Sequence, residues 1–387
     1  MKYEMIKLKE LCIVNQGLQI PISKRHKEPG ENRYFYITVQ FLKDNGENYY
    51  IENPPKSVTC TEDEILVVRT GNTGQVITGV AGCFHNNFFK VTPNEKVFPK
   101  YLYYALNNKK MHDAMLNAAS GTTIPDLKHS SFYDLEIPLP ELNIQKKIAK
   151  ILDNICNKLR LNNEINNNLE EQLKLFFEDN ILKKLNDENT YECSLYDQFD
   201  VIDNRGKTPP LVEHSKYPII DVKVLSGSER VINYNNCLKY VDKETYDTFF
   251  RSGHPKLYDT LLSTVGSLAE LKIYLENIGT IAQNVVALRP KNDYSLFMYQ
   301  YILSLRQRLT SYDIGSVQPS IKVTQFMKEI IKMPNDKEEI YKFENLAKAN
   351  TLKMRNLMME SRYLEQLRDT LLPKLMNGEI DLDNIEI

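Results

Sequence analysis

The longest regular pattern of apolar and polar positions covers residues 144–185. Ile148, Leu152, Ile155 and Leu159 follow one another at steps of four, three and four residues, which is the spacing of buried positions in a coiled coil. No glycine or proline interrupts the segment. The pattern predicts one helix roughly 60 Å long, far longer than the three-turn helix of an ordinary globular domain.

Two asparagines occupy the same series of positions, which becomes apolar again at Leu169, Leu173 and Phe176. Asparagine in the seam of a coiled coil lowers stability but fixes the register and orientation of the helices. We therefore predict that Asn162 and Asn166 set the register of a helix pair. A locally splayed and hydrated pair of helices is the alternative.

A helix of this length needs an equally long partner to cover its apolar stripe. Residues 338–375 provide one, because apolar residues recur there at similar spacing: Phe343, Leu346, Leu357, Leu364, Leu367 and Leu371. The chain is therefore expected to contain two long helices, each preceded by a globular segment.

The two globular segments repeat the same order of motifs. Each has a strand that runs into a glycine turn, a strand closed by proline, a helical stretch and a glycine-bearing loop, at 63–72, 86–93, 99–116 and 121–132 and again at 259–267, 283–290, 296–309 and 315–326. Pro125 and Pro319 lie 194 residues apart, as do Leu173 and Leu367. A period this long indicates a tandem duplication of a domain and its helix, and not a solenoid.

These boundaries predict an α+β fold with two α/β domains and two long helices. The first domain covers residues 1–142 and the central helix 143–190. The second domain covers 191–335, and the C-terminal helix with its tail covers 336–387.

Composition narrows the class of protein. The chain is 42% hydrophobic and 26% charged, as in soluble globular proteins, and it has no apolar run long enough for a membrane span. The N-terminus has no apolar signal core, which predicts a cytoplasmic protein. The six cysteines and six histidines are scattered singly, so we expect reduced thiols and no metal site.

Motifs for catalysis and cofactor binding are not found. Residues 53–56, NPPK, half-match the motif of amino-methyltransferases, but Lys56 stands where an aromatic residue is needed to stack the flipped base. The sequence contains no Walker-type loop, HExxH or GxSxG. We therefore predict a protein that is not an enzyme and needs no cofactor.

Two stretches carry a resemblance to a known family. PLPELNIQKKIAKILDNI (Pro138–Ile155) and LEQLRDTLLPKLMNGEI (Leu364–Ile380) are similar to the central and C-terminal conserved regions of specificity subunits of Type I restriction-modification systems, the HsdS family. DEILVVRTGNTG (Asp63–Gly74) and the GTTIP and GSVQP loops resemble parts of its target-recognition domains. The second domain departs from this pattern, because it has GSLAEL where the first has GNTG, and we expect a different local turn there.

The resemblance implies a function. Each domain would read one half of a split site in double-stranded DNA, and the helices would pair antiparallel and set the spacing between the half-sites. It also implies that the subunit performs no chemistry and docks two modification (methyltransferase) subunits, to which two restriction (motor-nuclease) subunits are added.

Sequence reading in DNA needs hydrogen-bonding side chains on loops and cations for phosphates. In the first domain the candidates lie in a basic loop, the glycine turn and the third loop: Lys24, Arg25, Lys27, Arg33, Arg69, Asn72, Thr73, Thr122 and Lys128. In the second domain they are Arg205, Lys207, Arg230, Arg251, Lys256, Ser267, Gln318, Ser320 and Lys322. Solvated surface loops and purely structural turns are the alternatives at every position.

Net charge leaves rival functions open. The formal charge of −2 argues against a simple polyphosphate binder, so DNA reading would need local basic patches or a basic partner. A specificity subunit of a related Type II-like modification system is one alternative. A coiled-coil scaffold that recruits proteins and not DNA is another.

Overall fold

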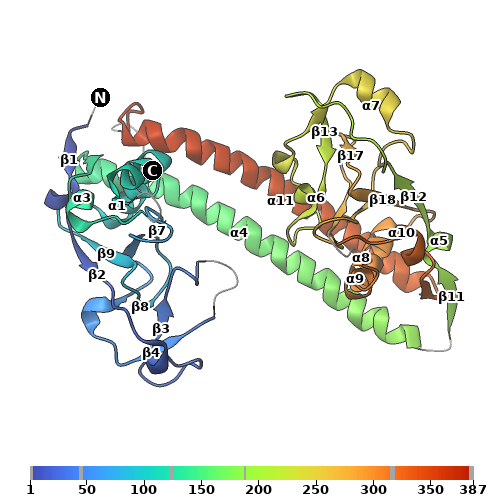
Figure 1. Cartoon of the computed structure of the whole chain (residues 1–387), viewed down its shortest axis with the longest axis horizontal. Coiled ribbons are helices and arrows are strands. Elements are labelled where there is room, and N and C mark those ends of the chain that lie inside the picture. Colours follow the sequence, from blue (N-terminus) through green and yellow to red (C-terminus); the bar gives the residue numbers. More distant parts are fainter. Residues whose placement is uncertain (1–2, 43–46, 122–124, 187–188, 314–318, 383–387) are drawn as a thin grey trace. The chain divides into compact units, whose positions relative to one another are not determined.

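The computed structural model describes residues 3–42, 47–121, 125–186, 189–313 and 319–382 (Figure 1). The chain divides into two compact units. Unit 1 consists of Met1–Leu159 and Tyr363–Ile387, and unit 2 consists of Arg160–Arg362. Each unit therefore contains one globular domain together with a part of each long helix.

Unit 1 has two four-stranded sheets, one antiparallel and one mixed. The first has the order β2–β9–β6–β7, and the second has the order β4–β3–β8–β5 with β3 and β8 parallel. A short antiparallel pair, β1–β10, joins the two ends of the domain. The strands are β1 Met5–Lys7, β2 Cys12–Gln16, β3 Arg33–Ile37, β4 Tyr50–Glu52, β5 Thr59–Cys60, β6 Ile65–Val68, β7 Val76–Ile77, β8 Gly82–Phe84, β9 Phe88–Pro93 and β10 Glu136–Pro138.

Unit 2 repeats this topology, except that its mixed sheet has three strands and not four. Its sheets have the orders β12–β18–β15–β16 and β14–β13–β17, with β13 and β17 parallel, and β11 pairs with β19. The repeat read from the sequence is thus confirmed by strand order. The strands are β11 Thr190–Ser194, β12 Phe199–Asp203, β13 Tyr217–Ile220, β14 Tyr240–Val241, β15 Thr260–Ser263, β16 Leu271–Ile273, β17 Thr280–Ile281, β18 Val285–Pro290 and β19 Ile330–Pro334.

The two predicted long helices are confirmed as α4, Leu142–Asn180, and α11, Glu338–Met376. A 3₁₀ turn, η4 Leu182–Asn186, follows α4. The remaining α-helices are short: α1 Pro99–Leu106, α2 Lys109–Ala118, α3 His129–Tyr133, α5 Leu195–Gln198, α6 Val222–Leu225, α7 Lys243–Phe249, α8 Ser295–Ser304, α9 Arg306–Thr310 and α10 Val323–Phe326. Further 3₁₀ turns are η1 Leu8–Glu10, η2 Ile22–Lys24, η3 Lys56–Val58 and η5 Tyr234–Asn236.

The helix expected over residues 99–116 is two helices. The first ends at Leu106 with Asn107 as its C-cap. Asn108 caps the second, because its side-chain oxygen accepts a hydrogen bond from the N–H of Met111 at 3.0 Å. The stretch 296–309 is divided in the same way into α8 and α9. Apolar spacing alone did not reveal this break.

Both long helices contribute to the core of each unit. In unit 1, Ile148 of α4 belongs to the same buried cluster as Leu375 near the C-terminal end of α11. In unit 2, Phe177 near the end of α4 belongs to one cluster with Phe343 near the start of α11. The beginning of one helix thus packs with the end of the other, as expected for an antiparallel pair.

A polar side chain on each long helix, buried Gln145 and half-buried Glu344, holds the domain that precedes the helix in the chain. Gln145 of α4 accepts from the N–H of Phe98, just before α1, at 2.7 Å. Glu344 of α11 accepts from the N–H groups of Leu296 and Phe297 at the start of α8, at 2.9 and 2.8 Å. Free N–H groups at a helix start favour such acceptors. Each long helix is therefore held to its domain by hydrogen bonds of fixed direction as well as by apolar contacts.

Candidate nucleic-acid interface

Each domain presents a glycine turn at the end of a buried strand. The turn spans residues 69–74 between β6 and β7 in unit 1, and residues 264–269 between β15 and β16 in unit 2. In both, the N–H of the first turn residue donates to an asparagine carbonyl just before the neighbouring strand: Arg69 to Asn87 at 2.7 Å and Thr264 to Asn284 at 2.9 Å. The two turns therefore leave their sheets in the same way.

The second turn is closed like the first, and the expectation that GSLAEL would change it was wrong. Ala269 adopts a left-handed φ of +59°, where Gly74 has +86°. Its N–H donates to the carbonyl of Ser263 at 3.2 Å, as the N–H of Gly74 donates to that of Val68 at 2.8 Å. A left-handed alanine costs about 1–2 kcal/mol. Burial of the Ala269 methyl group partly offsets this cost.

The third loop of each domain is attached to its glycine turn at matching positions. The N–H of Leu127 donates to the carbonyl of Arg69 at 2.9 Å in unit 1. The N–H of Ile321 donates to the carbonyl of Thr264 at 2.8 Å in unit 2. The structure therefore brings together, in both units, two of the loops that the sequence suggested for DNA contact.

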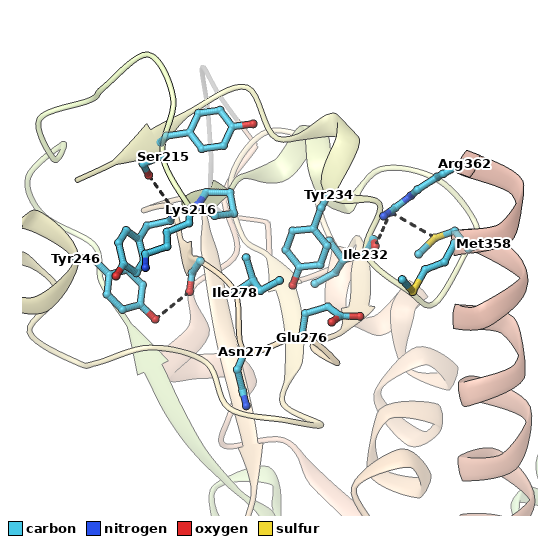
Figure 2. A pocket seen from close by; sticks show the side chains of 15 residues that line it. Ser215, Lys216, Ile232, Tyr234, Tyr246, Glu276, Asn277, Ile278, Met358 and Arg362 are labelled. Atoms are coloured by element: carbon cyan, nitrogen blue, oxygen red, sulfur yellow. Dashed lines mark hydrogen bonds between the residues drawn. The ribbon is translucent and has the colours of Figure 1, made fainter. Parts of the chain in front are cut away.

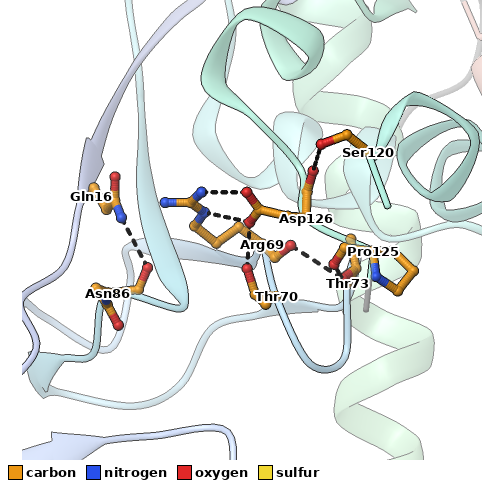
Figure 3. A network of polar contacts seen from close by, with 8 residues as sticks. All are labelled: Gln16, Arg69, Thr70, Thr73, Asn86, Ser120, Pro125 and Asp126. Carbon is orange, nitrogen blue, oxygen red and sulfur yellow. Dashed lines mark hydrogen bonds and ion pairs between the residues drawn. The ribbon is translucent and has the colours of Figure 1, made fainter. Parts of the chain in front are cut away.

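Side chains reinforce this attachment in unit 1 (Figure 3). The guanidinium of Arg69 donates to both carboxylate oxygens of Asp126, at 3.1 and 2.8 Å, and the Thr70 hydroxyl donates to the same carboxylate. The Thr73 hydroxyl contacts the carbonyl of Pro125 at 2.7 Å. Burial alone would raise the pKa of Asp126, but the bonds from Thr70 and Arg69 lower it below its usual value. This carboxyl is ionised at neutral pH and binds the two loops together.

Two of the proposed DNA contacts in this turn are therefore used internally. Thr73 is only 5% exposed, and the Arg69 side chain is 19% exposed and ion-paired. Asn72 is exposed and donates to the side chain of Gln75 at 2.7 Å. Gln75 was not among the sequence candidates. Exposed Asn72 in the turn and half-buried Gln75 just after it are amide side chains at this edge of the domain.

The basic loop of unit 1 contains one cation that folds back on its own domain. Arg25 donates from two guanidinium nitrogens to the carbonyl of Ile20, at 2.9 and 2.7 Å. It also lies over the ring of Tyr36, 5.0 Å from the centroid. The role of Arg25 in this structure is to hold the loop.

The other cations of this loop have weaker internal contacts. Lys24 is exposed, and the side chain of Lys27 is 74% exposed with its amine 3.8 Å from Glu47. Arg33 donates to the carbonyl of Glu28 at 3.3 Å. The exposed ion pair between Lys27 and Glu47 contributes little to stability at this distance. Lys24 and Lys27 are therefore available to phosphates.

In unit 2 the basic loop is joined to the same edge of the domain as the glycine turn. Gln283, next to the asparagine that anchors the turn, donates to the hydroxyl of Thr208 at 2.7 Å. Arg205 is paired with the carboxylate of Asp203, whereas Lys207 is exposed. Lys207 is therefore the cation of this loop that points to solvent.

The remaining candidates differ in exposure. Exposed positions are Lys128, Arg251, Lys256, Ser267 and Lys322, and Ser320 is half-buried with its N–H bonded to Asp313 at 2.8 Å. Thr122 and Gln318 lie outside the described residues.

Arg230 does not belong to this surface. Its side chain is fully buried and donates to both carboxylate oxygens of Glu170 in helix α4, at 2.6 and 2.7 Å. A buried guanidinium in a bidentate pair cannot reach a DNA phosphate. The prediction of a DNA contact at Arg230 is corrected for this reason. The residue type alone gave no sign of the partner 60 residues away.

The asparagines of the helix seam lie inside unit 2. Asn162 is fully buried, and its amide donates to Glu360 at 3.0 Å and to Ser361 at 3.2 Å on helix α11. Asn166 is half-buried, and its side-chain oxygen has no hydrogen-bond partner within the described residues. Asn162 thus has the directional contacts that a register-fixing residue needs, and its role stays a prediction.

A cavity of about 620 Å³ lies between helix α11 and the second domain (Figure 2). Its lining includes Tyr217, Tyr234, Tyr246 and Met358.

The ranges that the structure describes contain no cluster of side chains able to hold a metal ion and no helix able to cross a membrane.

Replacement of Asp126 by alanine is expected to lower the free energy of unfolding of unit 1 by about 1–2 kcal/mol, because Arg69 loses a partly buried charged partner. Asp134→Ala is the matched control, since Asp134 is 68% exposed in its pair with Lys7. Hydrogen exchange of the most protected amides of β9 in unit 1 measures the difference. Equal exchange rates in the two variants would contradict a structural role for the Arg69–Asp126 pair.

Comparison with known proteins agrees with this architecture. Residues 1–171 match the family model described as the Type I restriction modification DNA specificity domain. The MjaVIII specificity subunit of Methanocaldococcus jannaschii is 24% identical to this chain, and the alignment covers 92% of the chain and 88% of the relative. The MjaIX specificity subunit of the same organism is 26% identical over 93% and 86% of the two chains.

A solved structure has the same fold. The S subunit of the Type I restriction-modification system from M. genitalium matches with a TM-score of 0.64 at 19% identity, over 97% of this chain and 96% of that one. The fold, the family model and the full-length relatives agree with the resemblance seen in the sequence. The family model over residues 1–171 and the two relatives aligned over most of the chain make this protein similar to Type I restriction-modification specificity subunits.

Proposed function

We propose that the chain gives a Type I restriction-modification complex its DNA sequence specificity, with each domain reading one half of a bipartite site. The observation that supports this most directly is the duplicated edge. In each unit the glycine turn, the third loop and the end of the neighbouring strand are joined by equivalent backbone hydrogen bonds. A repeated loop assembly on a rigid sheet is suited to two separate acts of recognition.

The exposed side chains at these edges suit contact with duplex DNA. Exposed Asn72 and half-buried Gln75 carry amides, and an amide side chain can bond adenine through two hydrogen bonds. Exposed cations suited to phosphates are Lys24, Lys27 and Lys128 in unit 1 and Lys207, Arg251, Lys256 and Lys322 in unit 2. Internally paired Arg69 and Arg205 would act by shaping the loops.

The net charge of −2 repels DNA weakly, and this repulsion opposes the attraction of the local cations for phosphates. We infer that tight binding to DNA requires partner subunits that supply additional positive surface. The proposed partners are two modification subunits, which carry the methylation chemistry and its cofactor, and two restriction subunits, in the cytoplasm. The two long helices would dock the modification subunits.

The test is methylation mapping of a complex in a host without its own adenine methylation. The chain is co-expressed with its modification subunit, and N6-methyladenine is mapped across the genome. We expect one motif made of two fixed half-sites and an unspecified gap. Asn72→Ala should relax the bases of one half-site only, and Lys322→Ala should weaken methylation at all sites by several-fold, because a phosphate contact carries no sequence information.

Thr78→Ala, on the exposed side of the same hairpin, is the matched control for Asn72→Ala. Methylation that needs no chain, or that follows a single continuous motif, would overturn the proposal. Heat released when the isolated chain is titrated with S-adenosylmethionine would instead indicate an intrinsic methyltransferase.

A further inference from the structure

An ion pair between buried Arg230 and partly exposed Glu170 joins the second domain to helix α4. Arg230 donates to both oxygens of Glu170 and, at 2.9 Å, to the side chain of Gln300 in helix α8. The guanidinium also lies 5.2 Å from the ring centroid of Tyr299. We call Glu170, Arg230 and Gln300 the clamp. It links three elements of unit 2 through bonds of fixed direction.

The clamp is poorly explained as a source of stability alone. Removing the charge of Arg230 from water costs several kcal/mol, and Glu170, still 29% exposed, repays it only in part. Apolar residues of similar volume in place of such a pair are often as stable or more so. One guanidinium nitrogen of Arg230 is buried with no hydrogen-bond partner in the part of the chain that the structure describes. A buried pair that is not fully satisfied still fixes one relative orientation, which apolar contacts do less sharply.

The clamp is connected to the glycine turn of unit 2 through one short path. Arg230 lies in the connection 221–239 between β13 and β14, which is longer than the matching connection 38–49 of unit 1. The carbonyl of Arg230 accepts from the N–H of Ile273 at 2.7 Å, in the strand that follows the turn 264–269. A movement of Arg230 relative to the helix would therefore move the strand that carries the turn.

The same connection is bonded to the second long helix. The carbonyl of Ile232 accepts from the guanidinium of Arg362 in α11 at 3.1 Å (Figure 2). Arg355 of α11 forms an ion pair with Glu276, just after β16. Lys272 of β16 is almost fully buried, and its amine donates to the carbonyl of Gly227 at 3.1 Å. The connection is thus held on both helices and on the strand at once.

We propose that Arg230 is a positioning residue, which locks the second domain to helix α4 and thereby fixes where the second half-site is read relative to the helix. This inference rests on the proposed function in DNA reading. It assigns to Arg230 and Glu170 control of the length of the gap, while the bases of the half-site are read by the exposed loops.

The deciding experiment uses the whole chain in complex with its modification subunit. The double variant Arg230→Met/Glu170→Leu removes the directional pair but keeps an apolar contact, and Glu170→Gln neutralises one partner only. Glu171→Gln is the matched control, because Glu171 is the next residue of α4 and is 55% exposed beside Lys174. Methylation is measured on DNA substrates with the cognate half-sites and gaps that are one base pair shorter or longer.

We expect the double variant to fold and to methylate the altered gaps at least tenfold better, relative to the cognate gap, than the wild type does. Its half-site bases should be unchanged, Glu170→Gln should show a smaller shift, and Glu171→Gln none. Unchanged gap selectivity in a folded double variant would overturn the proposal. So would loss of folding in both clamp variants, since the pair would then be a stability element. Failure of the wild type to show a bipartite motif would refute the proposed function separately.

Discussion

Insertion of one heptad into each long helix is expected to lengthen the unspecified gap in the DNA site by up to about three base pairs. The insertions go between Leu159 and Arg160 in α4 and between Arg362 and Tyr363 in α11. These are the boundaries between the units, so every contact inside each unit is retained. The bases of the half-sites should not change.

The expected size follows from helix geometry. Seven residues add roughly 10 Å to a helix at about 1.5 Å per residue, and DNA rises about 3.4 Å per base pair. A heptad also shifts the helix face by only about 20°, which keeps the apolar stripe in phase. Asn162 with its partners Glu360 and Ser361 stays intact, because all three lie on the same side of the insertions.

Methylation mapping measures the gap. The control is the same number of residues inserted beside Gly79 in the connection between β7 and β8, where an added side chain would meet nothing within 4 Å. That insertion should leave the gap unchanged. A gap that stays constant with both helices lengthened would mean that the helices do not set the spacing.

The long helices and the repeat could be predicted from the sequence for a simple physical reason. A coiled-coil stripe needs apolar residues at regular steps over many turns, so the pattern is local and can be recognised in the sequence, even though α11 contains Pro373 near its end. A duplicated domain likewise repeats its turn residues in order, as Pro125 and Pro319 show. The exact buried positions of the helix were harder to predict. Phe176 was expected among them, but the structure buries Phe177 more fully.

The surface available to DNA could not be predicted equally well. Arg69 and Lys128 look alike as candidates in the sequence, but one is paired with Asp126 and the other is exposed. Whether a cation is free depends on a partner that lies far away in the chain, 57 residues for Arg69. Arg230 illustrates the same difficulty, because its partner Glu170 lies on the long helix. Loop composition therefore identified the region and not the contacting residues.

The packing of helix α4 against the second domain leads to the largest expected effect on stability. Phe177 is 1% exposed, with its ring centroid 5.5 Å from that of Phe297 and 5.4 Å from that of Phe343. Phe177→Ala leaves a cavity among these aromatic rings, and such changes cost about 3–5 kcal/mol. Leu175→Ala is the matched control, because Leu175 is 49% exposed two residues earlier on the same helix.

Hydrogen exchange of backbone amides is the suitable measurement, because a chain with two units has no single free energy of unfolding. In Phe177→Ala the most protected amides of α8 and β18 should exchange about a hundred-fold to several-thousand-fold faster, since about 1.4 kcal/mol corresponds to a factor of ten. Amides of β9 in unit 1 should keep their protection, because their core does not include Phe177. Equal loss in both sheets would mean that the units unfold together, and the helix would then transmit stability as well as position.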